Sequence, residues 1–274
     1  MDNIHSSYLE IINRPANDAC FSAALFDFDG TLSLVREGWQ QVMTPYFTDV
    51  IMETASHGPY EEERQNAEGF IDILTGKQTI YQCMRLAEEV KKRGGDPLPA
   101  HEYKQEYLRR LAKRIKMRKV NLKTGASKPG EFLVSGAASF LTALSAKNVY
   151  LYLASGTDLY DVLEEAALLD LTRYFDTNIF GAVDGRLDCS KETVINGVIG
   201  GKIPDGGRLL GFGDGYVEIE LIKKAGGYAV GVASDEKRLF NIDQKKRGRL
   251  INAGADAIIP DFSETELLMD FLNF

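Results

Sequence analysis

Two aspartates separated by one residue, Asp27 and Asp29, follow a short apolar run, and Gly30 and Thr31 come next. The run, residues 21–26, is apolar, short and closed by a glycine turn, which predicts a buried strand. Carboxylates that follow a parallel strand lie at the carboxyl edge of the sheet, where open α/β folds bind ligands. Two carboxylates this close repel each other unless a cation lies beside them. Mg²⁺ is the usual partner, because it binds carboxylates and substrate phosphates together. The pair therefore predicts phosphoryl chemistry.

Further residues that could do chemistry follow the later apolar runs or open the helices between them. After residues 149–154 comes a hydroxyl beside a glycine, and such a strand-to-helix turn binds anionic oxygens through backbone N–H groups. A lysine is expected to open a helix before the run 208–212, and a carboxylate follows that run, with another one helical turn further. In chain order these residues are Ser155, Gly156, Lys191, Asp214 and Glu218.

The elements that must position these residues show two different sequence patterns. From residue 21 to 29, and again from residue 148 onward, short apolar runs alternate with helix-like stretches. Strand and helix in alternation predict βαβ crossovers and a parallel sheet. The later runs are 149–154, 208–212, 228–232 and 257–259, and the helix-like stretches are 136–146, 158–169, 191–199 and 216–225.

The middle of the chain, residues 35–128, has another pattern. Apolar residues recur there at three- and four-residue spacing within residues 39–51, 80–90 and 103–115. This spacing is typical of amphipathic helices. The segment is interpreted as a compact helical insert between the first and second strands of the sheet.

Composition limits the classes of protein to consider. The chain has 274 residues and a net charge of −8, which argues against nucleic-acid binding. No apolar run is long enough to span a membrane, and the first residues lack the order of a signal peptide. Cys20, Cys83 and Cys189 are odd in number and far apart, which fits reduced thiols in a cytoplasmic protein.

The motifs resemble a known family in order, spacing and strand context, from about Phe21 to Phe274. The series Asp27-Phe28-Asp29-Gly30-Thr31, Ser155, Lys191 and Gly213-Asp214 is similar to the four motifs of the haloacid dehalogenase-like superfamily. The helical insert is similar to the cap of its phosphoglycolate phosphatase and β-phosphoglucomutase branch. The resemblance implies an α/β protein with a Rossmann-like core, residues 1–34 and 129–274, and an inserted all-helical cap domain, residues 35–128.

The chemistry of each motif follows from its residue types. Asp27 is the predicted nucleophile, which forms an aspartyl-phosphate. Asp29 is the predicted general acid and base. Ser155, Gly156 and Lys191 are expected to bind the phosphoryl oxygens. The resemblance implies that Mg²⁺ binds the Asp27 carboxylate, the Asp29 backbone carbonyl and Asp214.

Other positions leave alternatives open. Glu218 departs from the aspartate that the family most often has there, so it is either a neighbour of the metal ligands, an alternative metal ligand or a surface residue. Arg36, Trp39 and Lys77 are expected to contact substrate, although Trp39 fits the core of the cap equally well.

The sequence therefore predicts a Mg²⁺-dependent phosphatase for a small phosphorylated metabolite, such as a sugar phosphate. The alternative is a phosphosugar mutase. Mutases of the related branch carry a histidine soon after the first motif, where this chain has Trp39. A non-enzymatic module that binds a phosphorylated metabolite is a third hypothesis. The physiological substrate and the oligomeric state do not follow from the sequence.

Overall fold

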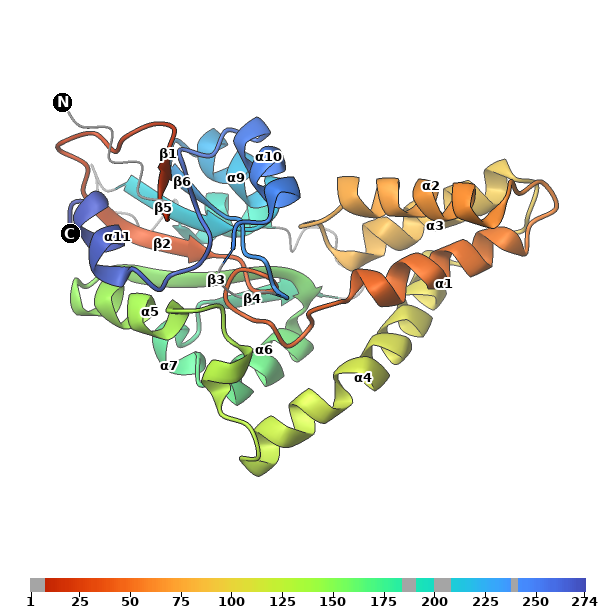
Figure 1. Ribbon diagram of the computed structural model, residues 1–274, viewed down its shortest axis with the longest axis horizontal. Coiled ribbons are helices and arrows are strands. Elements are labelled where there is room, and N and C mark those ends of the chain that lie inside the picture. The colour runs from red at the N-terminus through yellow and green to blue at the C-terminus, as the bar shows by residue number, and fades with distance from the viewer. Residues whose placement is uncertain (1–7, 184–190, 200–207, 238–240) are drawn as a thin grey trace. The chain divides into compact units, whose positions relative to one another are not determined.

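The computed structural model describes residues 8–183, 191–199, 208–237 and 241–274 (Figure 1). Within these residues, seven strands form one sheet in the order β1-β7-β6-β5-β2-β3-β4. Neighbouring strands are parallel except for β1 and β7. The predicted α/β fold with a parallel sheet is confirmed. The strands are β1 (Glu10–Ile11), β2 (Phe21–Phe26), β3 (Tyr150–Asp158), β4 (Ile179–Ala182), β5 (Arg208–Gly213), β6 (Tyr228–Val232) and β7 (Ala257–Ile259).

Strand β2 lies where the strand order reverses. From β2 the chain continues to β3 and β4 on one side, and it then adds β5, β6 and β7 on the other side. Open α/β sheets bind ligands in the crevice beyond the carboxyl ends of the strands at such a reversal. Residues that follow β2 are therefore neighbours of the carboxyl ends of both β3 and β5.

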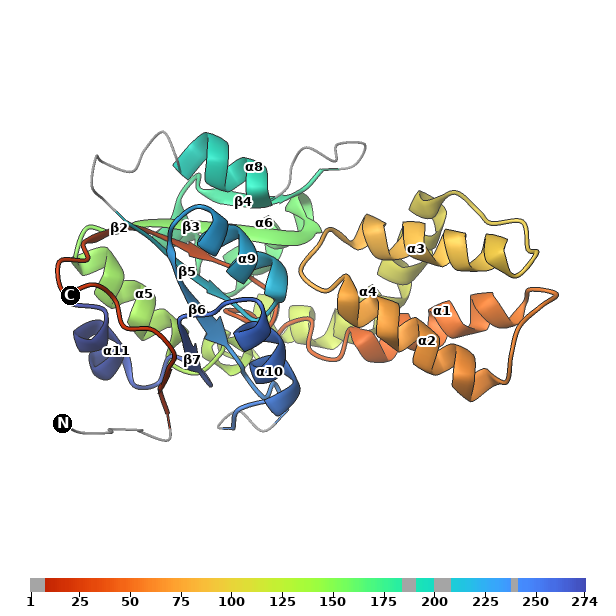
Figure 2. The same ribbon diagram turned by 90° about the horizontal axis from the view of Figure 1, so that it is seen from above.

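Helices cover both faces of the sheet. Figure 1 shows α5, α6 and α7 on one face and α9 and α10 on the other, and Figure 2 looks from above onto the face that carries α9 and α10. This two-sided cover is what buried parallel strands require. The elements of this part are η1 (Pro129–Phe132), α5 (Ala137–Ala146), α6 (Leu159–Leu168), α7 (Thr172–Phe175), α8 (Lys191–Thr193), the π-helix η2 (Val194–Ile199), α9 (Tyr216–Lys224), α10 (Gln244–Asn252) and α11 (Thr265–Phe271).

The two faces of β2 have different cores, because successive side chains of a strand point to opposite faces. Leu25 belongs to an aliphatic cluster with Ile222 of α9. Phe26 points the other way and stacks on Phe212 of β5, with ring centroids 4.7 Å apart. Phe140 of α5 packs edge-on against both rings. Both cores fix β2 at the centre of the sheet, and with it the residues that follow.

Strand β3 is longer than predicted. The sequence indicates a strand at residues 149–154 followed by a turn at Ser155, whereas β3 continues to Asp158 and α6 begins at Leu159. Strand β4, which the sequence analysis does not predict, pairs with β3 as far as Asp158, across an irregularity in register. The expectation of a strand-to-helix turn at Ser155 is therefore wrong. Ser155 and Gly156 lie within the strand and not at a helix N-terminus.

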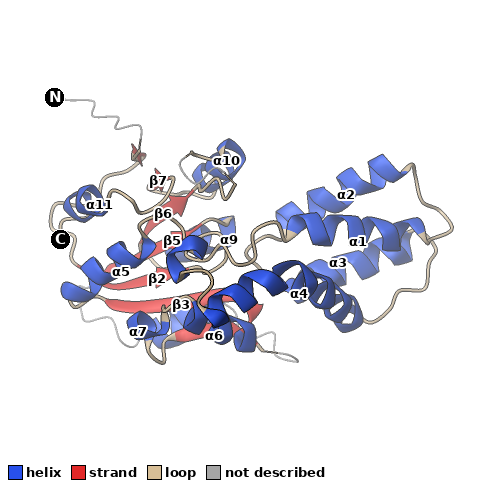
Figure 3. Ribbon diagram, turned by 60° about the horizontal axis from the view of Figure 1, so that its bottom comes forward, coloured by secondary structure: helices blue, strands red, loops and turns tan. Residues whose placement is uncertain are grey.

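The chain divides into two compact units, residues 1–37 with 121–274, and residues 38–120. The second unit, called the helical unit below, contains α1 (Gln40–Met52), α2 (Tyr60–Ile73), α3 (Thr79–Lys92) and most of α4 (Ala100–Thr124) (Figure 3). Helix α2 is not among the helices predicted from the sequence. The rings of Phe47 and Phe70 stack between α1 and α2. The role of this unit as a cap domain, predicted at residues 35–128, stays a prediction.

The sequence also predicts that the chain has no membrane-spanning helix and that its cysteines are reduced. Within the described residues, every helix is too short or too polar to cross a bilayer. Cys20 is exposed and Cys83 is buried, and both are free thiols. Cys189 lies outside the described residues. A cytoplasmic location stays a prediction.

Candidate active site

The first aspartate of the motif pairs with the predicted lysine. Strand pairing extends past β2, because the Asp27 amide donates to the Phe212 carbonyl at 2.9 Å. The Lys191 ammonium donates to Asp27 Oδ1 at 2.6 Å and also to Glu218 Oε1. All three side chains are buried. Glu218 is thus the second carboxylate that holds the lysine, and it does so from the first turn of α9.

A glycine makes this approach of α9 possible. A Cβ at Gly213 would lie 2.7 Å from Cβ of Glu218 and 2.9 Å from its Cγ. No side chain fits in that space, so the residue before Asp214 must be glycine for Glu218 to reach Lys191.

The second aspartate is held by hydroxyl groups of β3. The Thr157 hydroxyl donates to Asp29 Oδ2 at 2.8 Å, and the Ser155 hydroxyl lies 3.5 Å from the same oxygen. The Ser155 oxygen also accepts from the Thr157 amide at 3.0 Å. The other oxygen of Asp29, Oδ1, is buried and has no hydrogen-bond partner among the described residues. A buried oxygen without a partner is costly and often marks a functional group.

Arg36 lies close to that oxygen but is held by other carboxylates. Its Nε is 3.9 Å from Asp29 Oδ1. The guanidinium forms two hydrogen bonds of 2.9 Å, one to Glu165 and one to Asp161. Asp161 and Glu165 are four residues apart on α6 and so share one face of the helix. The prediction that Arg36 contacts substrate is untested, and in this structure its charge is directed at α6 and Asp29.

Asp214 follows β5 and is fixed by contacts from several elements. Its amide donates to the Thr31 hydroxyl at 3.0 Å. Its Oδ2 accepts from the Lys246 ammonium at 2.8 Å, and the same ammonium donates to Glu236 at 2.7 Å. Gly30 has φ +82°, and a Cβ there would lie 2.4 Å from Asp214 Oδ2. Glycine after Asp29 therefore provides both the turn and the space for this carboxylate.

The environment changes the proton affinity of both motif aspartates. Burial raises the pKa of Asp27, the Lys191 ammonium lowers it, and the charge of Asp214 raises it again. For Asp29, burial raises the pKa to about 7, with Arg36 lowering it and the charges of Glu165 and Asp27 raising it. A carboxyl group with a pKa near neutrality can both give and take a proton.

The residues present fit Mg²⁺ by the chemistry of their donor groups. Among the described residues, no group of three or more His, Cys, Asp or Glu side chains is placed to hold a metal ion. The predicted ligand set has only two carboxylates, those of Asp27 and Asp214, whose charges interact. The third predicted protein ligand is the backbone carbonyl of Asp29. Oxygens of water and of the substrate phosphate would complete the coordination. One or two carboxylates with waters and phosphate oxygens are the usual ligands of Mg²⁺ in proteins.

The structure brings most of the predicted residues together and leaves others apart. Asp27, Lys191 and Glu218 form one cluster, Asp29 with Ser155 a second, and Gly156 lies beside Ser155 in β3. Asp214 joins the first cluster through its charge. Trp39 and Lys77 belong to the helical unit, the first half-buried before α1 and the second exposed between α2 and α3. Their contact with substrate stays a prediction.

Several residues at this site are absent from the sequence-based prediction. Thr157 comes directly after Ser155 and Gly156, but only the structure of β3 shows that its hydroxyl reaches Asp29. Glu165 could have been found from its four-residue spacing to Asp161 on a predicted helix. Lys246 and Glu236 carry no such signal, because the lysine stands in a basic run that is typical of a solvated helix. Lys246 and Glu236 belong to the site through ion pairs between residues that are distant in sequence, and only the fold shows these pairs.

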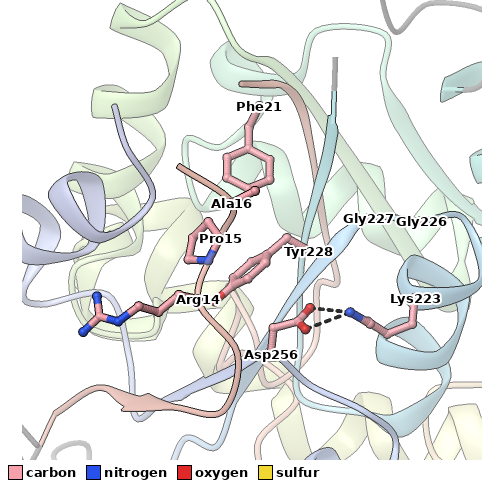
Figure 4. A pocket seen from close by; sticks show the side chains of 9 residues that line it. All are labelled: Arg14, Pro15, Ala16, Phe21, Lys223, Gly226, Gly227, Tyr228 and Asp256. Carbon is pink, nitrogen blue, oxygen red and sulfur yellow. Dashed lines mark hydrogen bonds and ion pairs between the residues drawn. The ribbon is translucent and has the colours of Figure 1, made fainter. Parts of the chain in front are cut away.

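A cavity of about 310 Å³ lies at the other edge of the sheet, where β2 and β6 begin. Figure 4 shows Asp256 and Lys223 of this cavity joined by two interactions, both of 2.8 Å. Asp256 also accepts from the Ala229 amide at 2.9 Å. The Tyr228 hydroxyl donates to the Asn13 carbonyl at 2.6 Å. These polar groups hold the N-terminal segment on the sheet, and the cavity contains none of the predicted catalytic residues.

Comparison with family models assigns most of the chain. A model described as haloacid dehalogenase-like hydrolase matches residues 21–226. Comparison with curated proteins found no match.

Solved structures share the fold across nearly the whole chain. A β-phosphoglucomutase from Clostridium difficile has a TM-score of 0.60 at 15% identity, covering 92% of this chain and 97% of that one. A predicted phosphoglycolate phosphatase from Haemophilus somnus has a TM-score of 0.56 at 17% identity, covering 91% and 98%. CbbY from Rhodobacter sphaeroides, solved with phosphate, has a TM-score of 0.56 at 18% identity, covering 93% and 100%. At these identities the likeness shows the fold alone.

Proposed function

The chain belongs to the haloacid dehalogenase-like hydrolase family, and on that premise we propose that it is a Mg²⁺-dependent phosphatase for a small phosphorylated metabolite. The reaction would pass through an aspartyl-phosphate on Asp27. Covalent catalysis divides one difficult displacement into two easier steps.

In the first step a carboxylate oxygen of Asp27 attacks phosphorus and the bond to the leaving oxygen breaks. Lys191 lies against this carboxylate, which supports its proposed role in offsetting charge on the phosphoryl oxygens. Glu218 keeps the ammonium in position. Ser155 and Gly156 of β3 are the proposed donors to the remaining oxygens.

Asp29 is the proposed general acid and base. It would protonate the leaving oxygen in the first step and then take a proton from the water that cleaves the aspartyl-phosphate. The Thr157 hydroxyl holds one carboxyl oxygen, while the buried Oδ1 has no partner among the described residues. The position of Asp29, with one carboxyl oxygen held by Thr157 and the other without a partner among the described residues, is the observation that supports the phosphatase proposal most. A phosphatase needs such an acid beside its nucleophile.

The proposed metal ligands are Asp27, the Asp29 carbonyl and Asp214. Bound there, Mg²⁺ would reduce the repulsion between an anionic nucleophile and an anionic phosphate. The donor chemistry and the charge interaction between Asp27 and Asp214 support this site.

The test uses a generic aryl phosphate with Mg²⁺. Asp27→Asn should lower kcat by at least about 10³-fold, because an amide cannot act as the nucleophile. Asp18→Asn removes an exposed aspartate and is the matched control. Full activity of the Asp27→Asn enzyme would refute the assignment.

The mutase alternative predicts another product. Incubation with a hexose 1-phosphate and Mg²⁺ should release inorganic phosphate if the protein is a phosphatase. An isomerised phosphosugar without free phosphate would favour the mutase. Trp39 stands where the related mutases carry a histidine, which supports the phosphatase.

A further inference from the structure

Lys246 is a mostly buried cation next to a proposed metal ligand. It lies in the first turn of α10, and its side chain is 12% exposed. Its ammonium donates to Asp214 Oδ2 at 2.8 Å and to Glu236 Oε1 at 2.7 Å. The Ser234 hydroxyl, 3.4 Å from the ammonium, donates in turn to the Gly30 carbonyl at 2.8 Å. Lys246 takes part in no step of the proposed mechanism.

Its contacts restrict how Asp214 can bind an ion. An oxygen that accepts from an ammonium is a poor ligand, because the ammonium repels a cation bound to the same atom. Oδ1 is then the oxygen left for coordination. The Asp214 backbone is also fixed, by Thr31 on its amide and by Arg249, which donates to its carbonyl at 3.3 Å. The carboxylate cannot easily turn to offer both oxygens.

The number and flexibility of oxygen ligands decide between two common ions. Mg²⁺ needs near-octahedral geometry and usually binds one oxygen from each of one or two carboxylates, with waters. Ca²⁺ takes six to eight oxygens, often both from one carboxylate, at longer distances. A carboxylate restricted to one oxygen therefore suits Mg²⁺ better.

We propose that Lys246 determines ion selectivity: by occupying Oδ2 of Asp214, it limits this carboxylate to one coordinating oxygen and disfavours Ca²⁺ relative to Mg²⁺. Lys246 is a positioning residue, which acts through Asp214. The inference rests on the metal site of the proposed function.

The test measures binding and needs no substrate. Isothermal titration calorimetry gives the dissociation constants of Mg²⁺ and Ca²⁺ for the full chain. Lys246→Met frees Oδ2 and should lower the ratio of the Ca²⁺ constant to the Mg²⁺ constant by about tenfold or more. Lys245→Met removes the neighbouring exposed lysine of the same helix and should leave the ratio as in the wild type.

A double variant separates geometry from charge. Lys246→Met alone leaves the mostly buried Glu236 without this cation and makes the net charge of the site one unit more negative. The double variant Lys246→Met with Glu236→Gln keeps the net charge of the wild type. It also removes the carboxylate that would otherwise lack its cation, so the folded state is less destabilised than in the single variant. The inference predicts the same fall in the ratio. Far-UV circular dichroism checks that each variant is folded.

The outcomes separate the two claims. A ratio in the double variant within about threefold of the wild-type value, while the wild type binds Mg²⁺, would overturn the selectivity role alone. A wild-type protein that binds neither ion would contradict the metal site, and with it the proposed function.

Discussion

Asp29 is the residue whose surroundings bear most directly on the chemistry. One carboxyl oxygen is fixed by a hydroxyl of β3, while the other lies buried beside a guanidinium that two carboxylates of α6 already hold. The acid is therefore oriented by the strand, and its charge is balanced by a cation that is itself held in place. Orientation by neighbours distinguishes a positioned acid from an ordinary turn aspartate.

Thr157 should matter through Asp29. Thr157→Val keeps the shape of the side chain but removes the hydroxyl, so a hydrogen bond to a charged group is lost. We expect kcat to fall by about tenfold to a hundredfold. Thr157→Ser retains a hydroxyl and should recover most of the rate, which a merely structural role would not require. Equal kcat values for the valine variant and the wild type would show that Thr157 does not position Asp29 for catalysis.

Glu218 should matter through Lys191. Glu218→Gln leaves the ammonium without one of its two carboxylates, so the lysine is held less firmly against the phosphoryl oxygens. We expect a loss of about tenfold to a hundredfold in kcat. Glu220→Gln changes an exposed residue of the same helix and is the control. If the two variants had equal rates, buried Glu218 would play no part in catalysis.

The helices of the helical unit are joined by an ion-pair cluster. Arg93 at the end of α3 donates to both carboxyl oxygens of Glu63 on α2, at 3.0 and 2.6 Å, and to Glu89 of its own helix at 2.5 Å. All three side chains are mostly buried. Such a cluster fixes the register of α2 against α3, because the planar guanidinium accepts few geometries.

This cluster predicts acid sensitivity of the helical unit. Burial raises the pKa of Glu89, but hydrogen bonds from Arg93 and Lys92 lower it to about 2, against an ordinary value of 4.5. The folded carboxylate therefore resists protonation more than the unfolded one. Its contribution to stability is full above pH 4.5 and is lost as the pH falls toward 2.

Urea unfolding of Arg93→Met, followed by circular dichroism, tests this contribution. At pH 7 we expect a loss of about 3 kcal/mol in the free energy of unfolding, because buried Glu63 loses its cation and buried Glu89 keeps only Arg85 and Lys92. The difference from the wild type should shrink between pH 4.5 and pH 2, over the interval between the two pKa values. Glu88→Gln, an exposed neighbour, is the control. A difference independent of pH would contradict the cluster.

Local patterns predict the elements that carry the motifs. β2, β5, β6, α5, α6 and α9 were all evident in apolar runs and helical spacing. The patterns failed where tertiary pairing decides the structure. β1 has two residues and β4 has four, too few for a periodic signal, and their pairing partners are distant in sequence. The extension of β3 through Ser155 depends on β4, so it could not be predicted either.

The same limit applies to the site. Asp27, Asp29, Lys191 and Asp214 could be predicted because they follow strands or open a helix at fixed positions in the topology. Lys246 could be identified only from the fold, since it lies 32 positions after Asp214 along the chain.

The molecule as a whole should respond to the metal. A ligand that binds only the folded state raises its stability by mass action, by about 2.7 kcal/mol at a hundred times the dissociation constant. We therefore expect Mg²⁺ to raise the melting temperature of the wild type. Asp214→Asn should abolish this rise while remaining folded. An equal rise in both proteins would place the ion elsewhere.

The most direct test of the account is the covalent state of Asp27. The Asp29→Asn enzyme, mixed with an aryl phosphate and Mg²⁺ and quenched in acid, should carry one phosphoryl group, because the water that cleaves the intermediate lacks its base. Peptide mass spectrometry should place this group on Asp27, and the Asp27→Asn control should carry none. Turnover in the wild type with no phosphoryl group trapped on Asp27 under any quench time, or trapping on another residue, would contradict the account.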